Sequence, residues 1–194
     1  NKVNFNSFHR LLYILRVIPK LGYFNVILIL FHRVLLKIRF ILNPAQKQNK
    51  RYGNIFSTSN STLDLSKRKN FFLLRIANQI IKGEIVYYSK KTFKVGSPPN
   101  WFLNPYNNKQ SVYQNIHWSK IKDFNNELGD IKNIWEVSRF EWIGTLAIAY
   151  KLNLDKKILE TINMWVNNWI YKNPINIGPN WKCGQEASIR LINI

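Results

Sequence analysis

The sequence contains a single cysteine, and this scarcity excludes two kinds of site. Cys183 has no second cysteine for an internal disulfide, and one thiol is too few for a cysteine-based metal centre. The histidines His9, His32 and His117 are too scattered along the chain to suggest a metal constellation. We therefore predict no metal and no cofactor, and cysteine usage leaves the redox compartment undetermined.

Acidic residues are absent from the first 63 positions, which contain ten Lys or Arg. The formal net charge of +19 is distributed as +10 over residues 1–63, +6 over 64–99 and +3 over 100–194. The N-terminal arm is strongly basic, whereas acidic and basic residues nearly balance in the last part of the chain. This distribution argues against a protein that binds nucleic acid with its whole surface, although the arm alone could bind phosphates or anionic lipid. Because charge runs are usually solvated faces, we expect no nucleic-acid partner.

A long apolar run is also missing. The run Val26–Phe31 ends at His32 and Arg33, well short of the roughly 18 apolar residues that a membrane span needs. A secretory signal is not predicted, because more basic residues and no small-residue cleavage site follow. The localisation is therefore left open between the periplasm and the cytoplasm of a bacterium.

What the chain does contain is 46% apolar residues with seven Trp and nine Tyr, which indicates a globular core. Periodicity predicts helices at 7–18, 24–41 and 73–81, and a polar linker over 43–70. Two β-rich runs at 84–88 and 92–96 predict a hairpin, and the prolines of 97–105 predict an extended segment. The basic helix at 24–41 is expected to pack on the body, with a membrane-surface helix as the alternative.

From Trp118 onward the chain is predicted to be helical. Asp130 or Asn133 can cap a helix there, and Glu136 would complete a capping box with Asn133. One stripe of that helix mixes aromatic residues with a guanidinium group: Trp135, Arg139, Trp142 and Leu146. A following helix, from about Asp155 to Pro174, has an apolar core face: Ile158, Ile162, Trp165, Val166 and Trp169. A further helix opens near residues 180–183, and such a series favours α/α hairpins, as in toroids and solenoids.

The most informative candidate site residue is Asn180, which follows Gly178-Pro179 at a predicted helix start. Free backbone N–H groups and the helix dipole favour an anion there, so its amide could donate to a carboxylate, while a plain N-cap role is the alternative. Trp181 beside it suits either the core or the face of a sugar ring. Glu186 with Arg190 forms an i,i+4 pair that is more often a structural brace than a catalytic acid.

Arg139 is the second candidate. Glu136 lies three residues before it, and Trp135 and Trp142 flank it in the sequence. Such an i,i+3 pair is more often a structural brace. A guanidinium group in aromatic surroundings is not expected to be a purely solvated charge, however, and it can hold an acidic ligand.

Several motifs together resemble the N-terminal part of heparinase II/III-like proteins. They are Trp101–Pro105, His117-Trp118, Gly129–Lys132, Trp135–Phe140, Leu146–Tyr150, Trp169 with Asn173-Pro174, and Asn180-Trp181 with Glu186–Arg190. The resemblance is close over roughly residues 80–194. It implies a mainly α fold: an incomplete α/α toroid with a small β-hairpin and a basic N-terminal helical arm, followed in the full protein by a β-sandwich. The domains would be an arm and linker at 1–63 and a truncated toroid at 64–194.

The same resemblance implies a lyase that cleaves uronate-containing acidic glycans of a bacterial envelope or the environment by β-elimination. Hydrogen-bond donors neutralise the uronate carboxylate, a Tyr or His removes the proton α to it, and the glycosidic oxygen leaves with proton assistance. By position Asn180 matches the carboxylate-neutralising Asn, and four further residues are expected to contact the polysaccharide: Arg139, Trp135, Trp181 and Glu186.

The catalytic Tyr and His are expected beyond Ile194, so we expect a fragment that is inactive alone. The absence of an initiating Met at Asn1 and of a helix stop at Ile194 fits the same expectation. A non-catalytic glycan-binding toroid and a basic anion-binding or membrane-surface protein are the alternatives. The sequence favours no particular oligomeric state.

Overall fold

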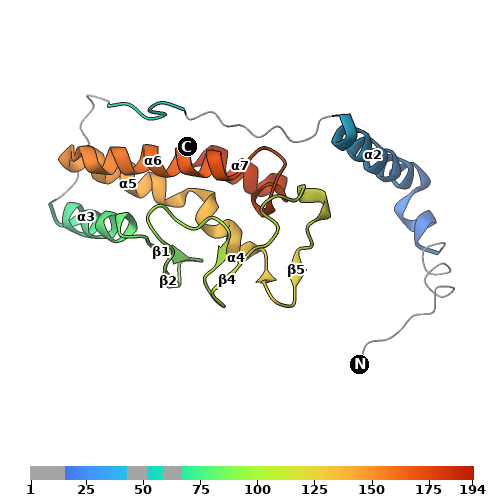
Figure 1. The fold of residues 1–194 in the computed structure, drawn as a ribbon, viewed down its shortest axis with the longest axis horizontal. Coiled ribbons are helices and arrows are strands. Elements are labelled where there is room, and N and C mark those ends of the chain that lie inside the picture. Colours follow the sequence, from blue (N-terminus) through green and yellow to red (C-terminus); the bar gives the residue numbers. More distant parts are fainter. Residues whose placement is uncertain (1–15, 43–51, 59–66) are drawn as a thin grey trace. The chain divides into compact units, whose positions relative to one another are not determined.

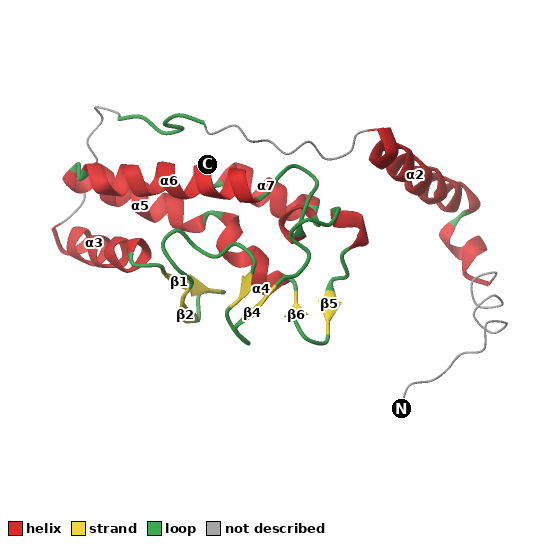
Figure 2. Ribbon diagram, in the orientation of Figure 1, coloured by secondary structure: helices red, strands yellow, loops and turns green. Residues whose placement is uncertain are grey.

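The computed structural model describes residues 16–42, 52–58 and 67–194 of the chain. It divides into two compact units, residues 1–44 and 45–194, which are described separately here. The described residues are mostly helical, with small two-stranded sheets in the second unit (Figures 1 and 2). Most of the helix predicted at 7–18 lies outside the described residues, and residues 16–21 are helical.

The first unit contains one long helix, α2 (Tyr23–Leu42), which confirms the helix predicted at 24–41. Gly22 separates it from the helical residues 16–21 and has a φ of +80°, in the left-handed region that glycine adopts without steric cost. The Asn25 side chain crosses this joint and donates to the carbonyl of Leu21 at 2.9 Å. Among the described residues, no helix is long and apolar enough to cross a bilayer.

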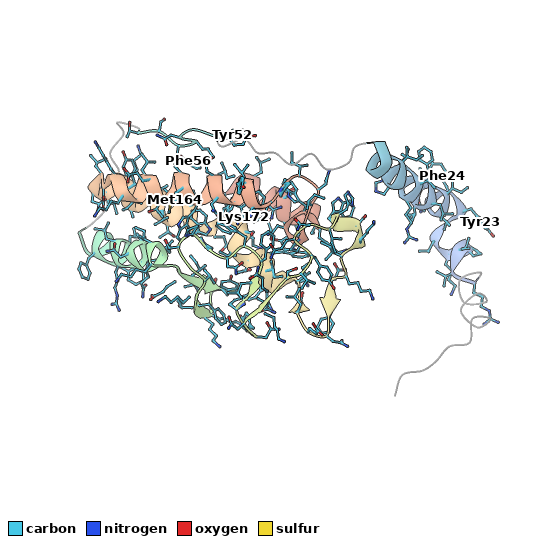
Figure 3. The ribbon with its side chains drawn as sticks, in the orientation of Figure 1. Tyr23, Phe24, Tyr52, Phe56, Met164 and Lys172 are labelled. Atoms are coloured by element: carbon cyan, nitrogen blue, oxygen red, sulfur yellow. The ribbon has the colours of Figure 1, made fainter. Side chains whose placement is uncertain are left out.

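The second unit begins earlier than the boundary predicted at residue 63. Residues 52–58, expected to be linker, lie along α6 (Lys156–Lys172), as the labelled Phe56 in Figure 3 shows. The Asn163 side chain accepts from the Phe56 backbone N–H at 2.9 Å and donates to the Phe56 carbonyl at 3.1 Å. A side-chain amide thus pairs both backbone groups of Phe56, and this segment belongs to the second unit.

Three helices form the core of the second unit: α3 (Lys67–Ile81), α5 (Glu141–Asn153) and α6, which pack against one another. α6 begins where the sequence predicted, because the Asp155 side chain caps it by accepting from the Lys157 N–H at 2.9 Å. Every member of its predicted core face is buried: Ile158, Ile162, Trp165, Val166 and Trp169. The Trp142 and Trp165 rings meet edge to face, with centroids 4.9 Å apart.

α3 begins at Lys67 and is six residues longer than the predicted helix at 73–81. The extra residues were assigned to a polar linker because Lys67-Arg68-Lys69-Asn70 carries no apolar periodicity. Lys and Arg are nevertheless good helix formers, so a charged first turn continues the helix without a core face.

The strands form three separate antiparallel pairs. β1 (Glu84–Tyr87) pairs with β2 (Lys91–Lys94), which confirms the predicted hairpin. β3 (Leu103–Asn104) pairs with β4 (Lys109–Gln110) inside the segment predicted to be simply extended. β5 (Phe124–Asn125) pairs with β6 (Gly129–Asp130), so the prediction that the chain is helical from Trp118 onward is wrong. Gly129, at φ +79°, closes this last hairpin, and its left-handed backbone interrupts any helix.

The long helix predicted around Arg139 is broken into three pieces. They are α4 (Lys132–Trp135), the 3₁₀ turn η2 (Glu136–Arg139) and α5, with Phe140 between the last two at φ +66°. The Arg139 carbonyl is released from helix pairing and accepts from the Asn193 side chain at 2.8 Å instead. The predicted stripe is therefore not continuous, because Trp135 packs with Ile131 in a small cluster while Trp142 and Leu146 enter the main core.

The last elements are η1 (Trp118–Lys120), the 3₁₀ turn η3 (Pro179–Trp181) and the helix α7 (Gly184–Ile192). The capping predictions in these regions are confirmed only in part: Asp130 bonds the first N–H of α4, whereas Asn133 lies inside α4 and forms no capping box with Glu136. Ile131 precedes α4 without a side-chain cap, although Asp130 accepts from the Lys132 N–H at 2.9 Å. Cys183, and not Asn180, is the N-cap residue of α7.

Candidate functional site

A buried ion-pair network lies where η2 meets α7. Arg139 donates from Nη1 to Glu136 Oε2 at 2.5 Å, and from Nε and Nη2 to the two Glu186 oxygens at 2.8 Å each. The two carboxylate side chains are only 6% exposed and the guanidinium side chain is 19% exposed. The bidentate geometry with Glu186 fixes the guanidinium plane, and the three side chains together carry a net charge of −1.

The i,i+3 pair of Glu136 with Arg139 is present as the sequence suggested, but Glu186 has a different partner. Glu186 was expected to pair with Arg190, but its ion pair is with Arg139, 47 residues away. Arg190 instead donates to the Asn180 carbonyl at 2.6 Å and places its guanidinium 5.0 Å from the centre of the Trp169 ring. Burial lowers the pKa of Arg190 to about 10. The i,i+4 spacing is therefore overridden by long-range partners.

The network continues to the tip of the β1–β2 hairpin through Glu136. The second Glu136 oxygen accepts from the Tyr88 backbone N–H at 2.7 Å, and the Tyr88 hydroxyl donates to Asn133 Oδ1 at 3.1 Å. Tyr88 and Ser89 both have left-handed φ values, +51° and +55°, in a tight turn closed by the Lys90 N–H on the Tyr87 carbonyl. A tyrosine held in this sparsely populated conformation, with both polar groups bonded to one neighbouring segment, is fixed in direction.

Burial raises the pKa of Glu136, and the bonds from Tyr88 and Arg139 oppose that effect. Hydrogen bonding to Glu186 raises the pKa of Arg139 above its usual value, so this residue keeps its charge at every accessible pH. Burial also raises the pKa of Tyr88 to about 12, with the Glu136 charge adding to the effect, and raises that of Tyr87 for the same two reasons.

These tyrosine pKa values predict an alkaline unfolding transition. A phenol whose pKa is higher in the folded state than its ordinary value near 10 contributes stability below about pH 10, and loses it as the pH rises toward 12. We expect circular dichroism to report unfolding in that window, together with late ionisation of these phenols by absorbance. Tyr88→Phe should move the transition upward, whereas Tyr171→Phe, at an exposed position, should leave it in place. A transition that Tyr88→Phe does not move contradicts the assignment.

A partly exposed group of side chains at the β1–β2 hairpin, which we call the hairpin aromatic patch, includes Tyr88. Its members are Tyr88, Lys91, Phe93 and Tyr106. The Phe93 and Tyr106 rings lie 4.7 Å apart, and the Lys91 ammonium stands over both, 4.9 Å from the Phe93 centre and 5.8 Å from the Tyr106 centre. Tyr106 is 46% exposed. The patch thus combines a positive charge with an accessible aromatic surface.

Glu136 also borders an open pocket of about 250 Å³ between α3, the β1–β2 hairpin and α5. Two further carboxylates, Glu84 and Glu141, line the same pocket beside apolar groups such as Trp142. Within the part of the chain that the structure describes, no three His, Cys, Asp or Glu residues are grouped closely enough to hold a metal ion.

Asn180, the predicted carboxylate-binding residue, is fully buried. Its side-chain Nδ2 donates to the Trp101 carbonyl at 3.0 Å and to Asn173 Oδ1 at 2.9 Å. Both amide hydrogens are thereby directed to internal partners, so neither faces a ligand in this conformation. These contacts indicate a structural role for Asn180. That role is not the N-cap role that the sequence left open.

The two predicted tryptophans are also held by internal bonds. Trp135 is 6% exposed and donates from Nε1 to the Pro179 carbonyl at 2.8 Å. Trp181 is half-buried, donates to the Asn173 carbonyl at 3.1 Å, and lies 5.7 Å from the Trp169 ring. The structure therefore brings Arg139 and Glu186 together directly, while Trp135, Asn180 and Trp181 brace the turn that precedes α7.

The hairpin aromatic patch was missed by the sequence reading. The run Tyr87-Tyr88-Ser89-Lys90-Lys91 was interpreted only as a strand end and a turn. A signal was present, because residues flanking a hairpin turn lie on an exposed tip, where aromatic and basic side chains together are typical of binding. The contribution of Tyr106 could not be seen, since it comes from the loop between β3 and β4.

Comparison of the chain with protein-family models, with curated proteins and with solved structures finds no match in any of the three.

Proposed function

We propose that the chain is the N-terminal part of a heparinase II/III-like polysaccharide lyase, which cleaves uronate-containing acidic glycans by β-elimination. The motif order from Trp101 to Arg190 supports this family. In this proposal the helices α3, α5 and α6 begin an incomplete α/α toroid, and a β-sandwich follows in the full protein. The catalytic Tyr and His would lie beyond Ile194.

The observation that carries the proposal is the hairpin aromatic patch. An acidic sugar needs a cation near its carboxylate and an apolar surface against its C–H face, and Lys91 with Tyr106 offers both within 5.8 Å. The Glu136–Arg139–Glu186 network holds Tyr88 in place, because Glu136 accepts from the Tyr88 backbone N–H. We therefore assign Arg139 and Glu186 a positioning role rather than direct contact with the glycan.

A second function, glycan binding without cleavage, is favoured by one observation. The residue proposed to neutralise the uronate carboxylate, Asn180, has no exposed atom. If no other donor replaces it, the protein would hold acidic glycans at the patch without lowering the barrier to proton removal.

Binding of uronate oligosaccharides to the chain tests the patch. We expect Lys91→Ala combined with Tyr106→Ala to weaken binding by about tenfold or more, because one charged contact and one aromatic surface are lost. The matched control is Tyr171→Ala with Lys172→Ala, which removes the same two residue types from exposed positions at the end of α6. Lys172 is labelled in Figure 3. Isothermal titration with galacturonate, glucuronate and alginate oligomers makes the measurement. Equal losses in both variants, or none in the patch variant, contradict the proposal.

Cleavage is tested separately with a chain that continues beyond Ile194. Elimination leaves an unsaturated uronate, which absorbs in the ultraviolet, so the lyase proposal predicts a rise in absorbance with these same oligomers. Binding that depends on the patch but gives no unsaturated product would favour the non-catalytic function.

A further inference from the structure

We propose that α2 lies in the surface of a membrane containing anionic lipids, with one apolar face inserted among the acyl chains. This interaction is separate from glycan binding and uses the first unit of the chain. The inference combines the pattern of residues around the helix, their exposure and the charge of the unit.

The apolar residues of α2 are concentrated on one side. At about 100° per residue, a single half of the helix circumference contains what we call the α2 apolar face: Tyr23, Phe24, Ile27, Leu28, Leu30, Phe31, Val34, Leu35 and Ile38. The polar residues Asn25, His32 and Arg33 all fall in the other half. A helix with this division is suited to lie along a boundary between water and an apolar phase.

The members of the α2 apolar face are between 42% and 71% exposed. The side chains of Tyr23 and Phe24 project outward from the helix in Figure 3. Nine large apolar side chains in one exposed row are far more than the scattered surface residues of a soluble domain, and a surface of this kind marks an interaction site.

The groove within the first unit lies mainly on the other half of the helix. Val17, Ile18 and Leu21 line it with Val26 and Ile29 of that half, and Leu30 borders it from the edge of the α2 apolar face. The joint at Gly22 thus folds the preceding turn against one side of α2. Among the described residues of the first unit, the opposite side of α2 stays exposed.

Charge favours a lipid surface as the partner of that side. Residues 1–44 contain seven Lys or Arg and no Asp or Glu. Residues 45–194 contain 22 basic and 10 acidic residues, a net charge of +12, so neither the remainder of this chain nor a second copy offers the helix an excess of negative charge. An anionic bilayer supplies both the apolar phase and the opposite charge, with each basic residue near the surface adding attraction.

Sedimentation of the whole chain with vesicles tests this assignment. We expect binding to phosphatidylcholine vesicles that contain phosphatidylglycerol, weaker binding to pure phosphatidylcholine, and a decrease as salt is raised. Phe24→Ser combined with Phe31→Ser should weaken binding by roughly tenfold or more, because two large apolar side chains no longer insert. Asn25→Ser with His32→Ser repeats the same spacing on the polar half without changing formal charge, and should retain binding within about twofold.

Three results would overturn the proposal. One is failure of the unchanged chain to bind the anionic vesicles, and another is equal binding by the two double variants. The third is a self-associated state, measured by analytical ultracentrifugation without vesicles, that the Phe24/Phe31 variant dissociates, since this would identify a second copy as the partner. Thermal unfolding of the whole chain, followed by the fluorescence of its tryptophans, which all lie in residues 45–194, serves as the folding control and should be the same in both variants.

Discussion

Replacing Arg139 by Met is expected to lower the free energy of unfolding by about 3 kcal/mol. The substitution keeps the aliphatic volume but leaves Glu136 and Glu186 facing each other as buried carboxylates without their shared cation. Removing one member of a buried ion pair typically costs about 3–5 kcal/mol, and the partial exposure of Arg139 favours the lower end of that range. Urea denaturation followed by tryptophan fluorescence measures the loss.

A double variant identifies the cause of that loss. If uncompensated charge is responsible, adding Glu186→Gln to Arg139→Met should restore part of the stability, because one buried negative charge is removed. Arg139→Lys should give an intermediate value, since Lys keeps the charge but cannot form the bidentate bond. A loss below about 1 kcal/mol in Arg139→Met would place the three side chains among ordinary surface pairs.

Asn180→Ala is expected to lower the free energy of unfolding by about 2–3 kcal/mol while leaving glycan affinity unchanged. The substitution removes the donor to the Trp101 carbonyl and to the Asn173 side chain, and leaves two buried acceptors unpaired. Thermal and urea unfolding measure the first effect, and titration with uronate oligosaccharides measures the second.

Asn115→Ala provides the comparison, because Asn115 is exposed in the turn before η1 and its replacement should change stability by about 0.5 kcal/mol or less. If the Asn180→Ala protein is instead stable but has lost its affinity for glycans, the structural role is contradicted. That result would favour the carboxylate-binding role that the position of Asn180 in the sequence suggested.

The elements predicted well are those whose signals are local. α6 was predicted from start to finish because an Asp cap, an apolar stripe and a closing Pro174 all act within one segment. The β1–β2 hairpin was found for the same reason, since its alternating pattern and polar turn are adjacent. The motifs around Arg139 and Glu186 also indicated correctly that these charges do not simply face solvent.

The errors arose where distant residues decide the local structure. No sequence signal near Phe140 predicts a left-handed residue, and the Arg139 carbonyl beside this break accepts from the side chain of Asn193, 54 residues later. Glu186 has an ideally spaced Arg190 within its own helix, yet it binds the guanidinium of Arg139. The position of Asn180 before a helix suggested an anion site, whereas its environment is set by Trp101, 79 residues earlier.

The long separations in these contacts also set an order of events during synthesis. The β1–β2 hairpin is local and can close as soon as it emerges, but Tyr88 is anchored only when Glu136 has followed, 48 residues later. The hydrogen bonds of Phe56 form only after Asn163 has been synthesised, 107 residues later. The Trp101 carbonyl finds its partner only after Asn180 has been synthesised, 79 residues later. Because the chain emerges N-terminus first, the aromatic core remains incomplete until Trp169 of α6 and Trp181 of η3 have appeared, and the preceding segments must avoid aggregation without them.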